Sequence, residues 1–496
     1  YFFGLFAVLG LVVLIYLGWS PFDKILAAYA NRDFTMTERV LTQFRIVVLY
    51  ISLLFYPYPS RLNLLHHITT SSSLSEPITT LLSFLIIVGL IGLAFYIARR
   101  QRLISFCILW FIINLVIESS VIGLELIYEH RLYLPMFGFA LIVSCLLFHF
   151  LSKKRLWAIV VSAVIIISLC TATYVRNRVW QNSIPLWSDA VSKSPQSHRA
   201  HLNLGVVLME QERFTEAVSH FSEALRIKPD YAIAHINLGT ALKEQGSLKE
   251  AISHFSEALR IRPDYAEAHN NLGTSLARQG KLKEAVGHFF KALRIKPNFA
   301  DAHYNLGVAL ERQERHKKAI RHFSVALRIK PDYPEAHNNL GTALARRGKL
   351  DEAIRHFSEA LRIKPDYAKA HNNMGTALKE LDSLNEAIRH FSEALRIDPD
   401  YAEARNNLGT ALARQGKLNE AINHFSEALR IKPGFAVTHY NLGVALMERG
   451  RLTEAVKHFS EALRINPDHS GAGHNLQICL QRMGKPAGAS KNAARP

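Results

Sequence analysis

Two hydrophobic patterns divide the chain near residue 175. Before that point, long runs of Leu, Ile, Val and Phe carry few charges; after it, apolar residues recur every three or four positions among polar ones. Runs of about 20 apolar residues predict helices that cross a bilayer, whereas the second spacing predicts amphipathic helices. We therefore expect an all-α protein, with a multi-span transmembrane helical domain over residues 1–175 followed by a domain in water.

The first part contains six stretches that are long and apolar enough to cross a bilayer. They are roughly residues 1–19, 41–58, 79–98, 103–125, 132–151 and 156–174. The second stretch contains Arg45 and ends at Pro57 and Pro59, so it can instead form a shorter helix in the interface, with Arg45 reaching toward the headgroups.

Basic residues alternate between the predicted loops. Loops 20–40, 99–102 and 152–155 each hold three Lys or Arg residues, whereas the intervening connections offer only Arg61 and Arg131. Short loops rich in Lys and Arg stay in the cytoplasm. The pattern predicts an integral protein of the bacterial inner membrane or its equivalent, with the residues after about 175 on the extracytoplasmic side.

Ionisable side chains also gather near the predicted outer ends of the spans. They are Arg61, Glu118, Glu129, His130 and Arg131. Ionisable groups at membrane depth are costly and often mark a functional site. The alternative is that they lie in water just beyond the hydrocarbon and form ordinary interfacial pairs.

The second part repeats itself every 34 residues. Pro recurs at 195, 229, 263, 297, 331, 365, 399, 433 and 467, and Gly recurs at 205, 239, 273, 307, 341, 375, 409 and 443. One Gly and one Pro per 34 residues is typical of tetratricopeptide repeats, which are pairs of helices. Each pair must bury its apolar faces against its neighbours, so we expect an α-solenoid, a right-handed superhelix.

We divide this part into segments by the period. They are a connecting half-repeat at 176–195, eight repeats at 196–467, a capping helix at 468–484 and a flexible tail at 485–496. Within the unit 264–297, Asp264 and Glu267 predict a capping box at the start of the first helix. Gly273 predicts a close approach of the partner helix, and Gly280 a left-handed residue where the first helix ends.

An asparagine recurs once per repeat on the predicted first helix, and we call this series the asparagine ladder. Its members are Asn203, Asn237, Asn271, Asn305, Asn339, Asn373, Asn407 and Asn441. An amide both donates and accepts hydrogen bonds, so the ladder can bind the backbone of an extended peptide. The alternative is a structural bond to adjacent backbone. If the ladder only binds peptide, replacing Asn271, Asn305, Asn339 and Asn373 by Ala should abolish capture and leave stability nearly intact.

Histidines recur in two further series. The first is His235, His269, His303, His337 and His371, which Arg405 interrupts, and we expect it to be neutral and partly buried between helices. The alternative for this series is a metal site or a pH switch. The second precedes a core Phe in each repeat and comprises His220, His254, His288, His322, His356, His390, His424 and His458. We expect these histidines to have no role beyond packing and the protein surface.

The segment Glu129-His-Arg-Leu-Tyr-Leu-Pro-Met-Phe-Gly138 resembles the membrane part of the transmembrane tetratricopeptide-repeat O-mannosyltransferases and their bacterial relatives, over most of residues 40–190. The resemblance implies a glycosyltransferase of the GT-C class and a polyprenyl-phosphate sugar donor. The family's Glu-Arg pair reads Glu129-His130 here, with the Arg at 131. A cation there can hold a lipid phosphate by a charge-assisted hydrogen bond. The family's acidic catalytic residues lie in an early loop that would precede Tyr1, so the catalytic residues are unknown.

The repeats resemble those of the nucleocytoplasmic O-linked N-acetylglucosamine transferase, whose asparagines at this position grip acceptor peptide. The chain opens at Tyr1 with no Met or charged leader, which suggests a piece of a longer protein. The net charge of +18 does not predict nucleic-acid binding, because basic and acidic residues are interleaved. The four Cys and the other side chains form no metal-ligand spacing, and this segment predicts no cofactor of its own.

Two functions remain open. The first is a scaffold tethered in the lipid bilayer whose repeats bind protein or peptide segments. The second is the rear part of a protein O-glycosyltransferase whose repeats select acceptors.

Overall fold

The computed structural model describes residues 34–55, 69–116, 133–151 and 154–484. Over these ranges the regular elements are all helices, which confirms the all-α class. The chain divides into two compact units, Tyr1–Ser247 and Leu248–Pro496.

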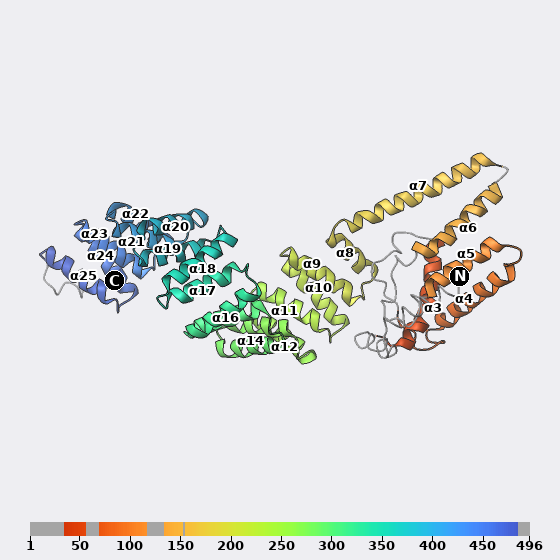
Figure 1. The fold of residues 1–496 in the computed structure, drawn as a ribbon, viewed down its shortest axis with the longest axis horizontal. Coiled ribbons are helices and arrows are strands. Elements are labelled where there is room, and N and C mark those ends of the chain that lie inside the picture. The colour runs from red at the N-terminus through yellow and green to blue at the C-terminus, as the bar shows by residue number, and fades with distance from the viewer. Residues whose placement is uncertain (1–33, 56–68, 117–132, 152–153, 485–496) are drawn as a thin grey trace. The chain divides into compact units, whose positions relative to one another are not determined.

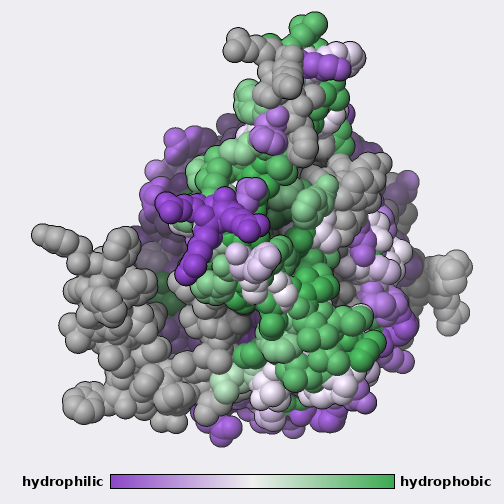
Figure 2. All heavy atoms as spheres, turned by 90° about the vertical axis from the view of Figure 1, so that its right-hand side faces the viewer, coloured by the Kyte–Doolittle hydropathy of each residue, from purple (hydrophilic) through white to green (hydrophobic). Residues whose placement is uncertain are grey.

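In the described part of the first unit, the first five helices are mostly apolar in sequence (Figure 1). They are α3 (Met36–Phe55), α4 (Ile78–Ile97), α5 (Arg102–Val116), α6 (Tyr133–Leu151) and α7 (Arg155–Trp180). Helix α3 packs against α4, α4 against α5, and α5 against α6. Many large apolar side chains of these helices are exposed, and Figure 2 shows hydrophobic surface over much of this part of the molecule.

Within the described residues, two helices are long and apolar enough to cross a membrane, Ile78–Ile97 and Leu156–Trp180. They correspond to two of the six predicted spans. The apolar helices at Arg102–Leu115 and Met136–His149 are shorter. Residues 1–19 lie outside the described part of the chain.

Helix α3 covers the stretch whose sequence left two alternatives open. It contains Glu38, Arg39 and Arg45, and its Arg39 side chain is fully buried. Arg45 donates a hydrogen bond of 2.8 Å to the carbonyl of Thr69, which ties the following segment back to this helix. A buried polar residue and a tethered Arg are more typical of an internally packed helix than of one surrounded by lipid.

Four amphipathic helices complete the first unit. They are α8 (Ser183–Lys193), α9 (His198–Glu210), α10 (Phe214–Ile227) and α11 (Ala232–Glu244). Helices α9 and α10 form a pair, and α8 packs on α9 from the other side. The Ser197 hydroxyl caps α9 by accepting a hydrogen bond of 3.3 Å from the amide of Ala200.

The second unit is a stack of helix pairs (Figure 1). Its helices are α12 (Leu248–Ile261), α13 (Ala266–Arg278), α14 (Leu282–Ile295), α15 (Ala300–Arg312), α16 (His316–Ile329), α17 (Pro334–Ala345), α18 (Leu350–Ile363), α19 (Ala368–Glu380), α20 (Leu384–Ile397), α21 (Ala402–Arg414), α22 (Leu418–Ile431), α23 (Ala436–Glu448), α24 (Leu452–Ile465) and α25 (Ser470–Arg482). Each helix packs on the next in sequence, and first helices of consecutive pairs also touch, as α13 and α15 do. This is the α-solenoid that the 34-residue period predicts.

Two predictions about the unit 264–297 are confirmed. A Cβ atom on Gly273 would lie 2.7 Å from Cε1 of Phe289, so only a glycine allows the second helix to come this close. Gly280 has φ +83°, the left-handed conformation that favours glycine where a helix ends.

The predicted capping box is wrong. Helix α13 begins at Ala266, its N-cap residue is Tyr265, and no side chain caps it. Asp264 therefore lies one residue outside the cap, and Glu267 instead pairs with Lys296 at 2.9 Å. The half-buried Tyr265 occupies the cap position, where the Arg262 guanidinium lies 4.9 Å from its ring centroid.

Candidate functional site

The asparagine ladder lies on the first helix of every repeat, with each member half-buried. In the second unit its members occupy α13, α15, α17, α19, α21 and α23. Because the first helices of consecutive pairs touch, the ladder runs along one side of the stack.

The ladder amides bond to a second asparagine series that the sequence analysis missed. Asn373 Nδ2 donates to Asn338 Oδ1 at 2.9 Å, from one repeat to the repeat before it. The same bond joins Asn305 to Asn270, Asn407 to Asn372 and Asn441 to Asn406 at 2.9–3.0 Å. The accepting asparagines are all buried. The doublets at 270–271, 338–339, 372–373 and 406–407 were the available signal.

Two repeats have a tyrosine at this acceptor position, Tyr304 and Tyr440, and a hydrogen bond from the ladder reaches the first of them. Asn339 Nδ2 donates to the Tyr304 hydroxyl at 3.1 Å, and Tyr304 stacks on Tyr333 with ring centroids 4.9 Å apart. The ladder amide is therefore held from the preceding repeat here as well. We expect these bonds to contribute to stability. The expectation from sequence, that replacement of ladder residues leaves stability nearly intact, therefore stays a prediction that unfolding measurements must test.

The ladder side chains keep one polar atom available. No described hydrogen bond uses the Oδ1 of Asn305, Asn373, Asn407 or Asn441. Among the described residues the buried side-chain atoms that lack a partner are Glu311 Oε2 and His316 Nδ1, so these carbonyl oxygens reach solvent. A carbonyl whose amide nitrogen is already fixed is oriented to accept a backbone N–H from an extended chain.

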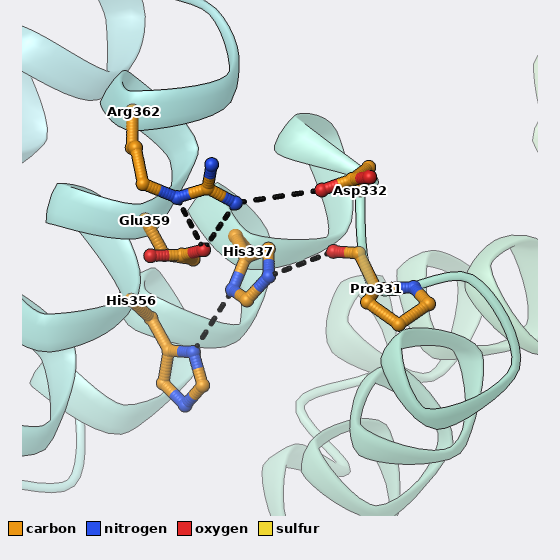
Figure 3. Close-up of polar contacts among 6 residues, drawn as sticks. All are labelled: Pro331, Asp332, His337, His356, Glu359 and Arg362. Carbon is orange, nitrogen blue, oxygen red and sulfur yellow. Dashed lines mark hydrogen bonds and ion pairs between the residues drawn. The ribbon is translucent and has the colours of Figure 1, made fainter.

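The two histidine series form pairs across the two helices of a repeat. In Figure 3, His337 Nδ1 lies 3.1 Å from His356 Nδ1, and His337 Nε2 lies 3.1 Å from the carbonyl oxygen of Pro331. The other Nδ1–Nδ1 contacts, at 3.0–3.1 Å, are His201–His220, His269–His288, His303–His322, His371–His390 and His439–His458. The second series therefore has a partner, which the sequence analysis did not assign to it.

Burial disfavours a charge on several of the paired rings. It lowers the pKa of His288 and His322 to about 4, helped in each case by the neighbouring histidine of the pair. Burial also lowers the pKa of His356, and His337 and Arg355 add to that effect. In the first series burial lowers the pKa of His269, His303 and His337, which agrees with the prediction for these three residues.

One repeat carries a cluster of charged residues that the others lack. Glu311 Oε1 pairs with Arg346 NH1 at 2.7 Å, and Glu311 Oε2 lies 2.9 Å from His316 Nδ1. The geometry of the second contact is not that of a hydrogen bond. His316 occupies a position where other repeats have Leu, namely at 248, 282, 350, 384, 418 and 452.

The other candidate residues are not placed. Arg61, Glu118, Glu129, His130 and Arg131, the candidate carrier site, all lie outside the described residues. In the part of the chain that is described, no group of three His, Cys, Asp or Glu side chains could hold a metal ion.

The model of the tetratricopeptide repeat matches residues 196–264, 230–298, 264–332, 298–366, 332–400 and 366–433, and a second model of the same description matches 412–477. Together they span more than half of the chain. The chain belongs to the tetratricopeptide repeat family. Its repeats account for the helix pairs, the Gly–Phe contacts and the ladder position described above.

A curated relative is a protein O-mannosyl-transferase of Caenorhabditis elegans, 38% identical over 80 residues. That match covers 16% of this chain and 11% of the relative, so the chain spans a small part of its length. Similar solved structures include the Cut9–Hcn1 hetero-tetramer of APC/C (TM-score 0.46, 20% identity, 58% of this chain and 56% of that one). Another is YrrB, described as a tetratricopeptide repeat protein with an unusual peptide-binding site (TM-score 0.32, 29% identity, 37% and 95%).

Proposed function

We propose that this chain is a membrane-anchored tetratricopeptide repeat protein whose repeats bind extended segments of other proteins through the asparagine ladder. The observation that carries the proposal is the state of the ladder amides. In four ladder residues Nδ2 is held by a buried asparagine of the preceding repeat, while Oδ1 remains open to solvent; these are Asn305, Asn373, Asn407 and Asn441.

This arrangement suits a ligand that offers a regular series of N–H donors. An extended peptide has such a series in its backbone, and the ladder offers one acceptor per repeat. Because the inter-repeat bonds fix each acceptor before the ligand arrives, little side-chain entropy is lost on binding. Recognition of the backbone alone would accept many sequences.

The membrane anchor is part of the same proposal. Support comes from α4 and α7, which are long and apolar enough to cross a bilayer and expose large apolar side chains such as Phe95 and Ile159. The basic loops favour an arrangement in which the repeats are extracytoplasmic. Protease digestion of sealed right-side-out vesicles tests this arrangement, and repeats that survive intact would contradict it.

The ladder can be tested with two sets of substitutions that remove the same three hydrogen bonds. The first replaces the donors Asn373, Asn407 and Asn441 by Ala. The second replaces their acceptors Asn338, Asn372 and Asn406 by Ala, which leaves the ladder amides in place. The readout is capture of a mixed-sequence peptide library by the full chain in lipid nanodiscs.

We expect wild type to capture peptides and the donor set to lose capture. The acceptor set should retain part of it, because its ladder carbonyls are present but no longer fixed from the preceding repeat. Equal losses in the two sets would show that the asparagines serve only to hold the repeats together. If the wild type captures no peptide, the proposal that the repeats bind extended peptides is contradicted.

A second candidate function rests on the O-mannosyl-transferase match and on the segment 129–138. In that case the repeats select acceptors for a protein O-glycosyltransferase, and Arg61, Glu118, Glu129, His130 and Arg131 hold the polyprenyl-phosphate sugar donor. Transfer of labelled mannose from a polyprenyl-phosphate to a captured peptide by the full-length protein would favour it. Capture of peptide without transfer of mannose would support the peptide-binding function and contradict the transferase function.

A further inference from the structure

The histidine pairs have a defined arrangement of hydrogens. A carbonyl oxygen only accepts hydrogen bonds, so the Nε2 of His337 must carry the hydrogen that it shares with Pro331. In a neutral ring the other nitrogen is then bare, so His337 Nδ1 accepts and His356 Nδ1 donates. The bond therefore joins the two helices of one repeat, α17 and α18.

One repeat supports this assignment. Arg405 stands at the first histidine position, and its Nε and NH2 donate to the carbonyl of Pro399 at 3.2 and 2.8 Å. An arginine has donors only, so this position serves to donate to the proline carbonyl. Its partner on the second helix, His424, is retained.

A neutral pair of this kind can bind at most one additional proton and keep its hydrogen bond. A proton on Nδ1 of His337 is accommodated only if His356 moves its own hydrogen from Nδ1 to Nε2, so that His337 donates the bond between the helices. A second proton would place N–H against N–H, and the bond would be lost. A proton on His356 Nε2 keeps the bond but puts charge on a half-buried ring.

The charged groups around this pair come from its own helices and from the preceding turn. Glu352 and Glu359 favour a charge on His356, whereas Arg355 opposes it. Glu359 is itself bonded to Arg362 at 2.7 Å, and Arg362 also pairs with Asp332 at 3.4 Å (Figure 3). Glu352 pairs with Lys349 at 2.8 Å, so the carboxylates nearest the pair are largely compensated by basic side chains.

We propose that the histidine pairs make the repeat region acid-labile, so that its paired helices separate as the pH falls from about 7 to about 5. The proposal goes beyond peptide binding and does not depend on it. Metal binding fits the histidine pairs less well. The Nε2 of the first ring is hydrogen-bonded to the proline carbonyl, and among the described residues no third His, Cys, Asp or Glu lies near enough to complete a site.

The sign follows from proton binding in the two states. Above the unfolded value of about 6.5, both folded and unfolded histidines are neutral. Burial lowers the folded pKa of His288 and His322 to about 4 and lowers that of His356 and His390 as well. Below about pH 6.5 the unfolded chain therefore binds protons that the folded chain does not bind. The free energy of unfolding consequently decreases as the pH is lowered. Carboxylates contribute to such a loss only at lower pH.

The test is thermal unfolding of the full chain in detergent micelles, followed by far-ultraviolet circular dichroism between about pH 7.5 and 5. The variant replaces His288, His322, His356 and His390 by Gln, whose amide can still donate but does not titrate. His474→Gln is the control, because this exposed histidine is outside the pairs. We expect the melting temperature of wild type and control to fall by roughly 10 °C, and that of the fourfold variant by less than half as much.

A second measurement holds even if the variant folds poorly. Hydrogen exchange at the imidazole C2 position, read by mass spectrometry on the wild type, reports the pKa of each ring. We expect His288 and His322 to titrate well below the ordinary value of about 6.5. Titration at or above that value, or the same pH dependence in wild type and the fourfold variant, would overturn the proposal.

Discussion

Gly307 lies directly against the ring of Phe323. A Cβ atom at position 307 would come within 2.6 Å of Cε1 of that ring, and the Phe323 side chain is fully buried. The same contact occurs between Gly and Phe at 205 and 221, 273 and 289, 341 and 357, 375 and 391, 409 and 425, and 443 and 459. This contact sets how closely the two helices of a repeat approach each other.

Substitution of Gly307 by Ala should therefore destabilise the repeats. The ring has no space to retreat in a densely packed core, so we expect a loss of about 1–3 kcal/mol in the free energy of unfolding, measured by urea denaturation. Gly287→Ala is the matched control, since nothing lies within 4 Å of a Cβ there. In mid-helix Ala is favoured over Gly by about 1 kcal/mol, so the control should be neutral or stabilising. Similar losses in both variants would argue against the contact.

Truncation of Phe323 to Ala should be more costly. It removes a fully buried ring and leaves a cavity, for which we expect a loss of about 3–5 kcal/mol. Phe290 is 51% exposed on the neighbouring helix α14, so Phe290→Ala should change stability by less than about 0.5 kcal/mol. Urea denaturation of the two variants side by side checks the packing of the second helices.

His316 should be replaceable with a gain in stability. The position holds Leu in six other repeats, and the imidazole lies beside Glu311 without hydrogen-bond geometry. We expect His316→Leu to raise the free energy of unfolding by about 0.5–2 kcal/mol, as substitutions toward the repeat pattern often do. The reverse change, Leu350→His, should lower it. If His316→Leu is destabilising, the Glu311–His316 contact contributes more than its geometry indicates.

The donor and acceptor sets of the asparagine ladder should be similarly destabilised. Each removes the three bonds between asparagines, at about 1 kcal/mol per bond. The donor set also loses the longer bonds to Thr342 and Thr410, and the acceptor set also loses the bonds to Asn339 and Thr438. We therefore expect a loss of at least roughly 3 kcal/mol in each triple variant, measured by thermal and urea unfolding. A donor set as stable as wild type would show that these bonds add nothing to the stability of the stack.

The sequence by itself determined the repeat architecture. A 34-residue period with Gly and Pro at fixed places can be satisfied only by similar helix pairs that stack, so the roles of Gly273 and Gly280 followed from the spacing alone. The apolar stretches at 79–98 and 156–174 were equally readable, because length and composition alone decide whether a helix can cross a bilayer. Short sequence motifs predicted the helix ends less well. Asp264 and Glu267 have the spacing of a capping box, but they do not form one.

Only the tertiary structure decided which polar side chains meet. Asn373 and Asn338 are 35 residues apart, and His337 and His356 are 19 apart. A period shows that a residue type recurs, but not which face of a neighbouring helix it meets. Such contacts depend on the crossing of two helices and on the direction of each side chain, which stacking fixes and sequence spacing does not.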